Sequence, residues 1–318
     1  MNKRCKLDDI NDNLEDIYDI FICSASFENR CLSIPEKIKK IEFRKVLIIQ
    51  NNKGSIKTLE NGAELKRLYP DAQVIDVEFG NGIAYVDQLI SEIRKIKGKC
   101  MSVLIDMTTF THELLMITLK YLYVSARKVQ HITCIYINAK EYCPGVPVKE
   151  KWLTVGSERV TPILGYPGMF LPSNKTQLVI IVGYEYGRAL DVIEKTEPNS
   201  ITLIYGKTNN SITEKDKEAN EFYTKLTEDM LFGYSNIEKI EASCDDPEDV
   251  ARILEELYDR YDDKNIIVVP MNNKITTLGL FISLIHNEDV QVSYAPAIVY
   301  NEQNYSIPGT DCFICELK

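Results

Sequence analysis

The sequence has no long hydrophobic run and no excess of positive charge, and both absences narrow what the chain can do. No stretch approaches the roughly 20 apolar residues that a membrane helix needs, and residues 1–16 lack the apolar core of a signal peptide. Lys and Arg number 37 against 47 Asp and Glu, for a net charge of −10. Without a membrane helix or a signal peptide, we expect a cytoplasmic protein that does not bind membranes. Because duplex nucleic acid is bound nonspecifically through clustered Lys and Arg, we also expect no binding to duplex nucleic acid.

Cysteine is present without the pattern that a disulfide framework or a metal site needs. The nine cysteines are an odd number without framework spacing, so we expect reduced and mostly buried thiols. Cys312 and Cys315 have zinc or redox spacing, but no second cysteine pair or histidine cluster accompanies them. GxGxxG and P-loop fingerprints are also missing. The sequence therefore predicts no metal ion and no resident cofactor.

What is present is an alternation of apolar strands and helical patterns in a chain of 318 residues, long enough for two domains. In the first half, strands are expected at 17–23, 45–50, 72–77, 103–106 and 131–138, with helical patterns between them. Such alternation is typical of a parallel sheet with right-handed crossovers. The first half is therefore predicted to be Rossmann-like.

The same alternation of strand and helix patterns recurs after a stretch rich in Pro and Gly at 141–174. Strands are expected again at 177–182, 201–205, 237–242, 266–269 and 290–298. A repeat of about 160 residues is too long for a solenoid. We predict two tandem Rossmann-like domains with doubly wound parallel sheets, related by internal duplication. Their predicted boundaries are 1–145 and 176–318, with a connector at 146–175.

Ligands of doubly wound sheets sit beyond the carboxyl ends of the strands, so the turns there are the candidate sites. After the fourth strand come Asp106, Thr108, Thr109 and Thr111. A buried Asp must be paired or hydrogen-bonded, and threonines at a helix N-terminus suit an anion. His112 could move protons near neutral pH, although a surface histidine would look the same. A threonine that merely caps the helix is the alternative for this turn.

The turn after the first strand carries Ser24, Ser26, Glu28 and Arg30. Small hydroxyl residues allow close approach of a phosphate, a Glu can accept from ribose hydroxyls, and an Arg can clamp an anion. A serine cap followed by a solvated first helical turn is the equally weighted alternative.

Related side chains recur in the second half. Glu185 and Arg188 follow its first strand, and Asn272, Asn273 and Lys274 follow its fourth. Lys274 is a phosphate-binding residue type, so these residues complete the predicted ligand-binding set.

The turn Asp106-Met-Thr108-Thr109-Phe-Thr111 and the serine-rich turn after the first strand resemble the ligand turns of the CARF and SAVED group. These are Rossmann-like sensor domains of prokaryotic antiviral systems that bind cyclic oligonucleotides, usually across two related modules. Phe110 stands where that group commonly has glycine, and His112 where it has lysine. The resemblance implies a nucleotide-like ligand at these turns.

Three functions remain open on the sequence. The first is a sensor or regulatory subunit that binds a nucleotide-like small molecule and acts on a separately encoded effector protein; a homodimer is compatible with it. The second is an enzyme that cleaves a phosphodiester or N-glycosidic bond, with Asp106 or Glu28 as acid or base and His112 assisting. The third is a structural subunit whose turns bind only a protein.

Overall fold

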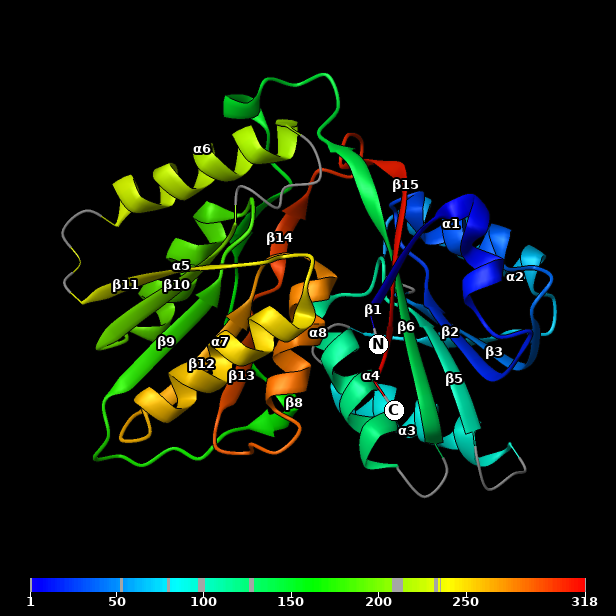
Figure 1. Cartoon of the computed structure of the whole chain (residues 1–318), viewed down its shortest axis with the longest axis horizontal. Helices are drawn as coiled ribbons and strands as arrows, with labels where there is room; N and C mark the ends of the chain where they lie inside the picture. Colours follow the sequence, from blue (N-terminus) through cyan, green and yellow to red (C-terminus); the bar gives the residue numbers. More distant parts are fainter. Residues whose placement is uncertain are drawn as a thin grey trace. The chain divides into compact units, whose positions relative to one another are not determined.

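The chain forms two compact units in the computed structural model (Figure 1). Unit 1 comprises Met1–Pro144 and Ser306–Lys318, and unit 2 comprises Gly145–Tyr305. The structure describes residues 2–51, 54–78, 81–96, 101–125, 129–207, 214–231, 234 and 236–317. These units differ from the predicted boundaries in two respects. The residues of the predicted connector belong to unit 2, and the last strand returns to unit 1.

The sheet of unit 1 has the spatial order β1-β15-β6-β5-β2-β3-β4. Its parallel strands are β2 (Ile17–Ser24), β3 (Glu42–Gln50), β4 (Gln73–Asp76), β5 (Met101–Asp106) and β6 (Val129–Tyr142). Its helices are η1 (Leu7–Asn13), α1 (Arg30–Lys37), α2 (Ile56–Leu68), α3 (Gly82–Arg94) and α4 (His112–Val124). α1 and α2 lie together on one face of the sheet, and α3 and α4 lie on the other (Figure 1).

Both faces of this sheet are buried, which explains why its central strands are continuously apolar. Successive strand residues point to opposite faces, yet Phe21 and Ile22 in β2 are both fully buried, as are Leu47 and Ile48 in β3. One face packs Phe21 and Ile48 against Ile34 of α1. Local sequence sets where the helices begin: the Ser55 hydroxyl accepts from the Thr58 amide at the start of α2.

The two ends of the chain extend the sheet of unit 1 with antiparallel strands. β15 (Ser306–Glu316) pairs with β6, and β1 (Asn2–Lys6) pairs with β15. Cys312 lies opposite Cys5, while Cys315 lies opposite Cys134. Residues three apart in a strand face opposite sides of the sheet, so the Cys312 and Cys315 thiols do not converge on one ion.

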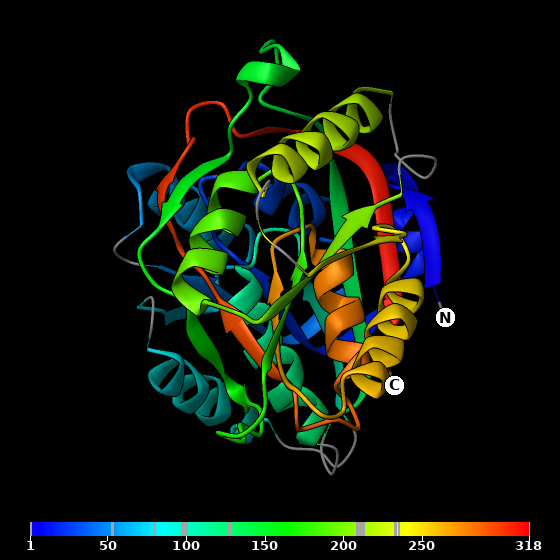
Figure 2. The ribbon, with the colours of Figure 1, turned by 90° about the vertical axis from the view of Figure 1, so that its left-hand side faces the viewer.

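The larger sheet of unit 2 has the order β11-β10-β9-β12-β13-β8. Its strands are β8 (Thr161–Pro167), β9 (Thr176–Ile181), β10 (Ser200–Gly206), β11 (Ile237–Ala242), β12 (Asn265–Pro270) and β13 (Gln291–Tyr294). The helical elements of this unit are η2 (Val148–Glu150), α5 (Tyr186–Thr196), α6 (Glu214–Met230), α7 (Pro247–Arg260) and α8 (Lys274–Ser283). Figure 2 shows α7 and α8 packed side by side.

The predicted strand at 290–298 is wrong as a single element. The chain forms β13 and then β14 (Ala297–Tyr300), which pairs with β7 (Thr154–Ser157) in a separate two-stranded sheet. Pro296 lies between the two strands. Because proline has no backbone N–H, it cannot continue a sheet ladder, and the strand breaks there.

The parallel strands of both units follow the same order. Numbered along the chain within each unit, they lie 3-2-1-4-5, with one antiparallel strand next to strand five: β15 in unit 1 and β8 in unit 2. This is the order of the Rossmann fold. The prediction of an α/β fold with parallel sheets is confirmed, while descent of the two units from one duplicated module stays a prediction.

None of the helices in the described part of the chain combines the length and hydrophobicity that crossing a membrane demands.

Candidate functional site

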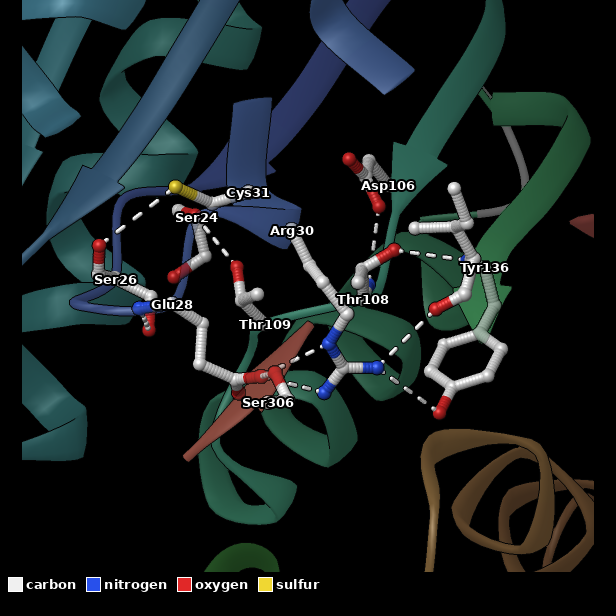
Figure 3. Close-up of polar contacts among 11 residues, drawn as sticks. Ser24, Ser26, Glu28, Arg30, Cys31, Asp106, Thr108, Thr109, Tyr136 and Ser306 are labelled. Atoms are coloured by element: carbon white, nitrogen blue, oxygen red, sulfur yellow. Dashed lines mark hydrogen bonds and ion pairs between the residues drawn. The ribbon is translucent and has the colours of Figure 1, made fainter. Parts of the chain in front are cut away.

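The strand order of unit 1 reverses between β2 and β5, and the turns that follow these strands lie side by side (Figure 3). Such a reversal leaves a crevice for a ligand, because the helices that follow the two strands go to opposite faces of the sheet. A hydrogen bond of 2.8 Å from the Thr109 hydroxyl to the Ser24 carbonyl joins the two turns. The structure therefore brings the two predicted turns of unit 1 together.

The turn after β5 is held by its own polar side chains. Asp106 is buried and accepts a hydrogen bond of 3.0 Å from the Thr108 amide. The Thr108 hydroxyl accepts from the Ile137 amide at 3.2 Å, which ties the turn to β6. The Thr111 hydroxyl accepts from the Leu114 amide and caps α4. His112 is the first residue of α4 and is buried, so it is not the surface residue of the alternative reading.

Burial raises the pKa of Asp106 to about 7. The hydrogen bonds from Thr108 and the charge of Arg30 favour the ionised carboxylate, but they offset only part of the cost of burying it. Near neutral pH this carboxyl group is thus divided between its protonated and ionised forms.

Arg30 and Glu28 form a buried ion pair at the start of α1 (Figure 3). Arg30 donates from Nε to Glu28 Oε2 at 2.8 Å, and its Nη2 lies 2.7 Å from the same oxygen. Its Nη1 donates to the Ile137 carbonyl at 3.2 Å and to the Tyr136 hydroxyl at 3.4 Å. Ser306 donates to Glu28 Oε2 at 2.7 Å. The pair therefore connects the turn after β2 to β6 and β15.

The surroundings of Arg30 favour its charge in spite of burial. Burial by itself would lower the pKa of the guanidinium, but electrostatic interactions with Glu28 and with the phenolic groups of Tyr142 and Tyr136 outweigh it and raise the pKa. The guanidinium carbon lies 5.5 Å from the ring centre of Tyr142 and 6.0 Å from that of Tyr136. Arg30 is thus a permanent cation inside unit 1.

The residues at this edge differ in how far they reach solvent. Ser24, Arg30, Asp106 and Thr108 are buried, whereas Ser26, Thr109 and Thr111 are half-buried. The Ser26 hydroxyl accepts from the Glu28 amide, and the Ser26 carbonyl accepts from Asn61 of α2 at 2.7 Å. Asn29 is exposed on the turn after β2, and the half-buried Ser26, Thr109 and Thr111 are the hydroxyl residues of these two turns that solvent partly reaches.

Unit 2 repeats the arginine arrangement with different partners. Arg188 of α5 is buried and ion-paired with Glu185, and it donates to the Ala295 carbonyl just beyond β13. Its Nη1 also donates to the Thr154 hydroxyl at 3.3 Å, and that hydroxyl donates to Glu185. In both units, the arginine after strand one therefore binds an acid of its own turn and a backbone carbonyl, which belongs to strand five in unit 1 and lies just beyond strand five in unit 2.

The strand-four turn of unit 2 also binds the strand-one turn. Asn272 donates to the Val182 carbonyl, and a Cβ on Gly183 would lie only 2.6 Å from the Met271 carbonyl. Asn273 caps α8 by accepting from the Thr276 amide at 3.0 Å, and it donates to the Cys244 carbonyl at 2.8 Å. Lys274 is the first residue of α8 and is half-buried.

Some partners of these residues could not be found from the sequence. Tyr136 and Ser306 lie 106 and 278 residues from their partners Arg30 and Glu28, and Thr154 lies 34 residues from Arg188. Tyr136 lies in the predicted strand at 131–138, whereas Ser306 of β15 and Thr154 of β7 lie outside the predicted strands. No spacing rule identifies which residue there meets the arginine.

The fold and these turns define an α/β protein with two Rossmann-like units, each with polar turns at the point where its strand order reverses. No protein-family profile matches the chain, and no curated protein matches its sequence. Within the part of the chain that the structure describes, no group of three or more His, Cys, Asp or Glu side chains is arranged to hold a metal ion.

Replacing Arg30 should destabilise unit 1 strongly. Arg30→Leu leaves the Glu28 carboxylate buried without its partner, and we expect the free energy of unfolding to fall by about 3–5 kcal/mol. Urea denaturation measures this change. Arg67, exposed and paired with Glu64, provides the control, because Arg67→Leu should leave stability nearly unchanged. Adding Glu28→Gln to Arg30→Leu should restore part of the loss, and equal losses in the Arg30 and Arg67 variants would contradict the structural role.

Asp106 should make stability depend on pH. Its pKa is about 7 in the folded protein and about 3.9 in an unfolded chain. Between these values the folded state holds a proton that the unfolded state has released, so stability falls as pH rises. Asp106→Asn does not titrate, so wild type should lose up to about 4 kcal/mol relative to this variant between pH 4 and pH 8. Denaturation at several pH values tests this, and parallel curves for the two proteins would refute the assignment.

Proposed function

We propose that the protein is a nucleotide-binding sensor or regulatory subunit whose ligand binds at the carboxyl ends of strands one and four. The observation that supports this most directly is the joining of these two turns in each unit, by Thr109 and Ser24 in unit 1 and by Asn272 and Val182 in unit 2. Each joined pair of turns lies where the strand order reverses, the usual ligand position in such sheets.

The buried and half-buried groups would have different tasks. Arg30 is ion-paired with Glu28 and Arg188 with Glu185, and both donate to backbone carbonyls. In this proposal the two arginines therefore hold the ligand-binding turns in place and do not bind the ligand. The ligand would meet the half-buried groups Ser26, Thr109, Thr111 and Lys274. α4 and α8 begin at these turns, and the positive end of a helix dipole favours phosphate. Lys274 adds a positive charge at the start of α8.

A regulatory role fits the type of groups present. The half-buried hydroxyl residues, the helix N-termini and Lys274 are groups that can bind an anion by hydrogen bonds and charge. The resemblance of the Asp106 turn to the CARF and SAVED turns favours a nucleotide, and in particular a cyclic oligonucleotide, as the ligand. In this proposal, the two units descend from one duplicated module, and the chain belongs to a prokaryotic antiviral system with a separate effector protein.

A thermal-shift screen of nucleotides, including cyclic oligonucleotides, tests the proposal. At least one nucleotide should raise the melting temperature in a saturable way. Lys274→Gln should weaken that ligand about tenfold, which corresponds to about 1.4 kcal/mol. Lys239→Gln is the matched control, because Lys239 carries the same charge on β11 and pairs with Glu228. If no nucleotide stabilises the protein, or if both lysine variants behave alike, binding at this edge is refuted.

An enzyme is the second candidate, and the pKa of Asp106 near 7 favours it, because general acids and bases work best near the ambient pH. Turnover of NAD, nucleosides and cyclic nucleotides should then be measurable by chromatography. Asp106→Asn should abolish such turnover, while Lys239→Gln should leave it intact. Absence of turnover, or turnover that persists in Asp106→Asn, counts against catalysis by Asp106.

A further inference from the structure

Unit 2 contains a cavity of about 680 Å³ at the amino ends of its parallel strands, opposite to the strand-one and strand-four turns. The residues that line the cavity lie where β9, β10 and β11 begin and where the chain leaves α7. Its volume falls within the roughly 300–1,000 Å³ of typical small-molecule sites. The proposed nucleotide site does not include this edge.

A network of polar side chains forms one wall of the cavity. Gln177 is buried, and its Nε2 donates to the Thr202 hydroxyl at 3.0 Å. Its Oε1 accepts from Ser200 and, at 3.0 Å, from Lys264. Buried polar groups that are fully hydrogen-bonded have defined positions, so this wall is preorganised.

The ammonium of Lys264 is held by neutral groups. It donates to Gln177 Oε1 and, at 3.1 Å, to the Ser200 hydroxyl, and it lies 4.1 Å from the ring centre of Tyr261. An ammonium has three N–H donors, so one is left for an occupant of the cavity. Within the described residues no carboxylate pairs with Lys264. Among the described residues, its positive charge is thus not balanced by a direct ion pair.

Two lysines and two carboxylates line the cavity among the described residues. The Glu238 carboxylate is occupied by Arg260, which lies outside the lining, and by the Tyr261 hydroxyl at 2.7 Å. Lys175 adds a second ammonium at the rim, and the exposed Asp263 adds a second carboxylate. The formal charges of the lining therefore balance, and the attraction for an anion comes from Lys264, which the neutral groups Gln177 and Ser200 hold.

From this geometry we propose a second ligand site in unit 2 that binds a small molecule through an oxyanion, either a phosphate or a carboxylate. Lys264 binds the oxyanion, held in place by Gln177, Ser200 and Tyr261. Lys175 adds attraction at the rim. The cavity has room beyond the oxyanion for the body of a small metabolite. The proposal does not depend on nucleotide binding at the opposite edge.

Binding of inorganic phosphate and of malonate, measured separately at constant ionic strength with chloride as the reference salt, tests this site. We expect a saturable rise in melting temperature with at least one probe, with a dissociation constant of about 1 mM. Lys264→Gln should weaken binding at least tenfold, and Lys175→Gln should weaken it less. Binding of both probes, or of only one, supports an oxyanion site and identifies which chemistry it prefers.

Three further variants assign the binding to this cavity. Lys264→Arg keeps the charge and should retain binding, which keeps the test decisive if Lys264→Gln folds poorly. Lys239→Gln, on β11 but outside the cavity, should leave phosphate binding unchanged. Lys274→Gln should also leave it unchanged, because Lys274 belongs to the opposite edge. Failure of both probes to saturate, or loss of binding in Lys274→Gln with retention in Lys264→Gln, overturns the proposal.

Discussion

In each unit, a buried arginine connects the chain segments that meet at the carboxyl ends of the parallel strands. Arg30 and Arg188 each bind an acid of their own turn and a carbonyl within or just beyond strand five, so one side chain connects the turn after the first parallel strand to the last parallel strand, across the strand between them. A guanidinium suits this task because it is always charged and offers several donors in a fixed plane. Removing either partner would leave a buried charge without compensation, which makes the arrangement costly to change.

The two units have the same order of parallel strands, but they differ at the end of strand four. β5 ends in Asp106 and β12 ends in Pro270, and a methionine follows in each. Burial leaves Asp106 only partly ionised near neutral pH, while the corresponding place in unit 2 has no titratable group. The half-buried Thr109 and Thr111 follow strand four in unit 1, and the half-buried Lys274 follows it in unit 2.

The sequence predicted the part of the fold that depends on local patterns. The apolar runs of β2 and β12 and the polar turns after them were found because a buried parallel strand has a composition of its own. The recurrence of Glu185 and Arg188 also anticipated a shared arrangement. The return of β15 to unit 1 and the contact between Ser306 and Glu28 depend on pairing across most of the chain, which no local pattern records. The break at Pro296 was missed because the apolar pattern continues across it.

Hydrogen–deuterium exchange over the whole chain, with and without a mixture of nucleotides, shows whether nucleotides bind at the turns after strands one and four. We expect nucleotides to slow exchange at the turns 24–30 and 106–113 of unit 1 and 183–188 and 271–276 of unit 2, because these turns form the proposed ligand site. Slower exchange only at segments away from these turns, or no change anywhere in the chain, would contradict it.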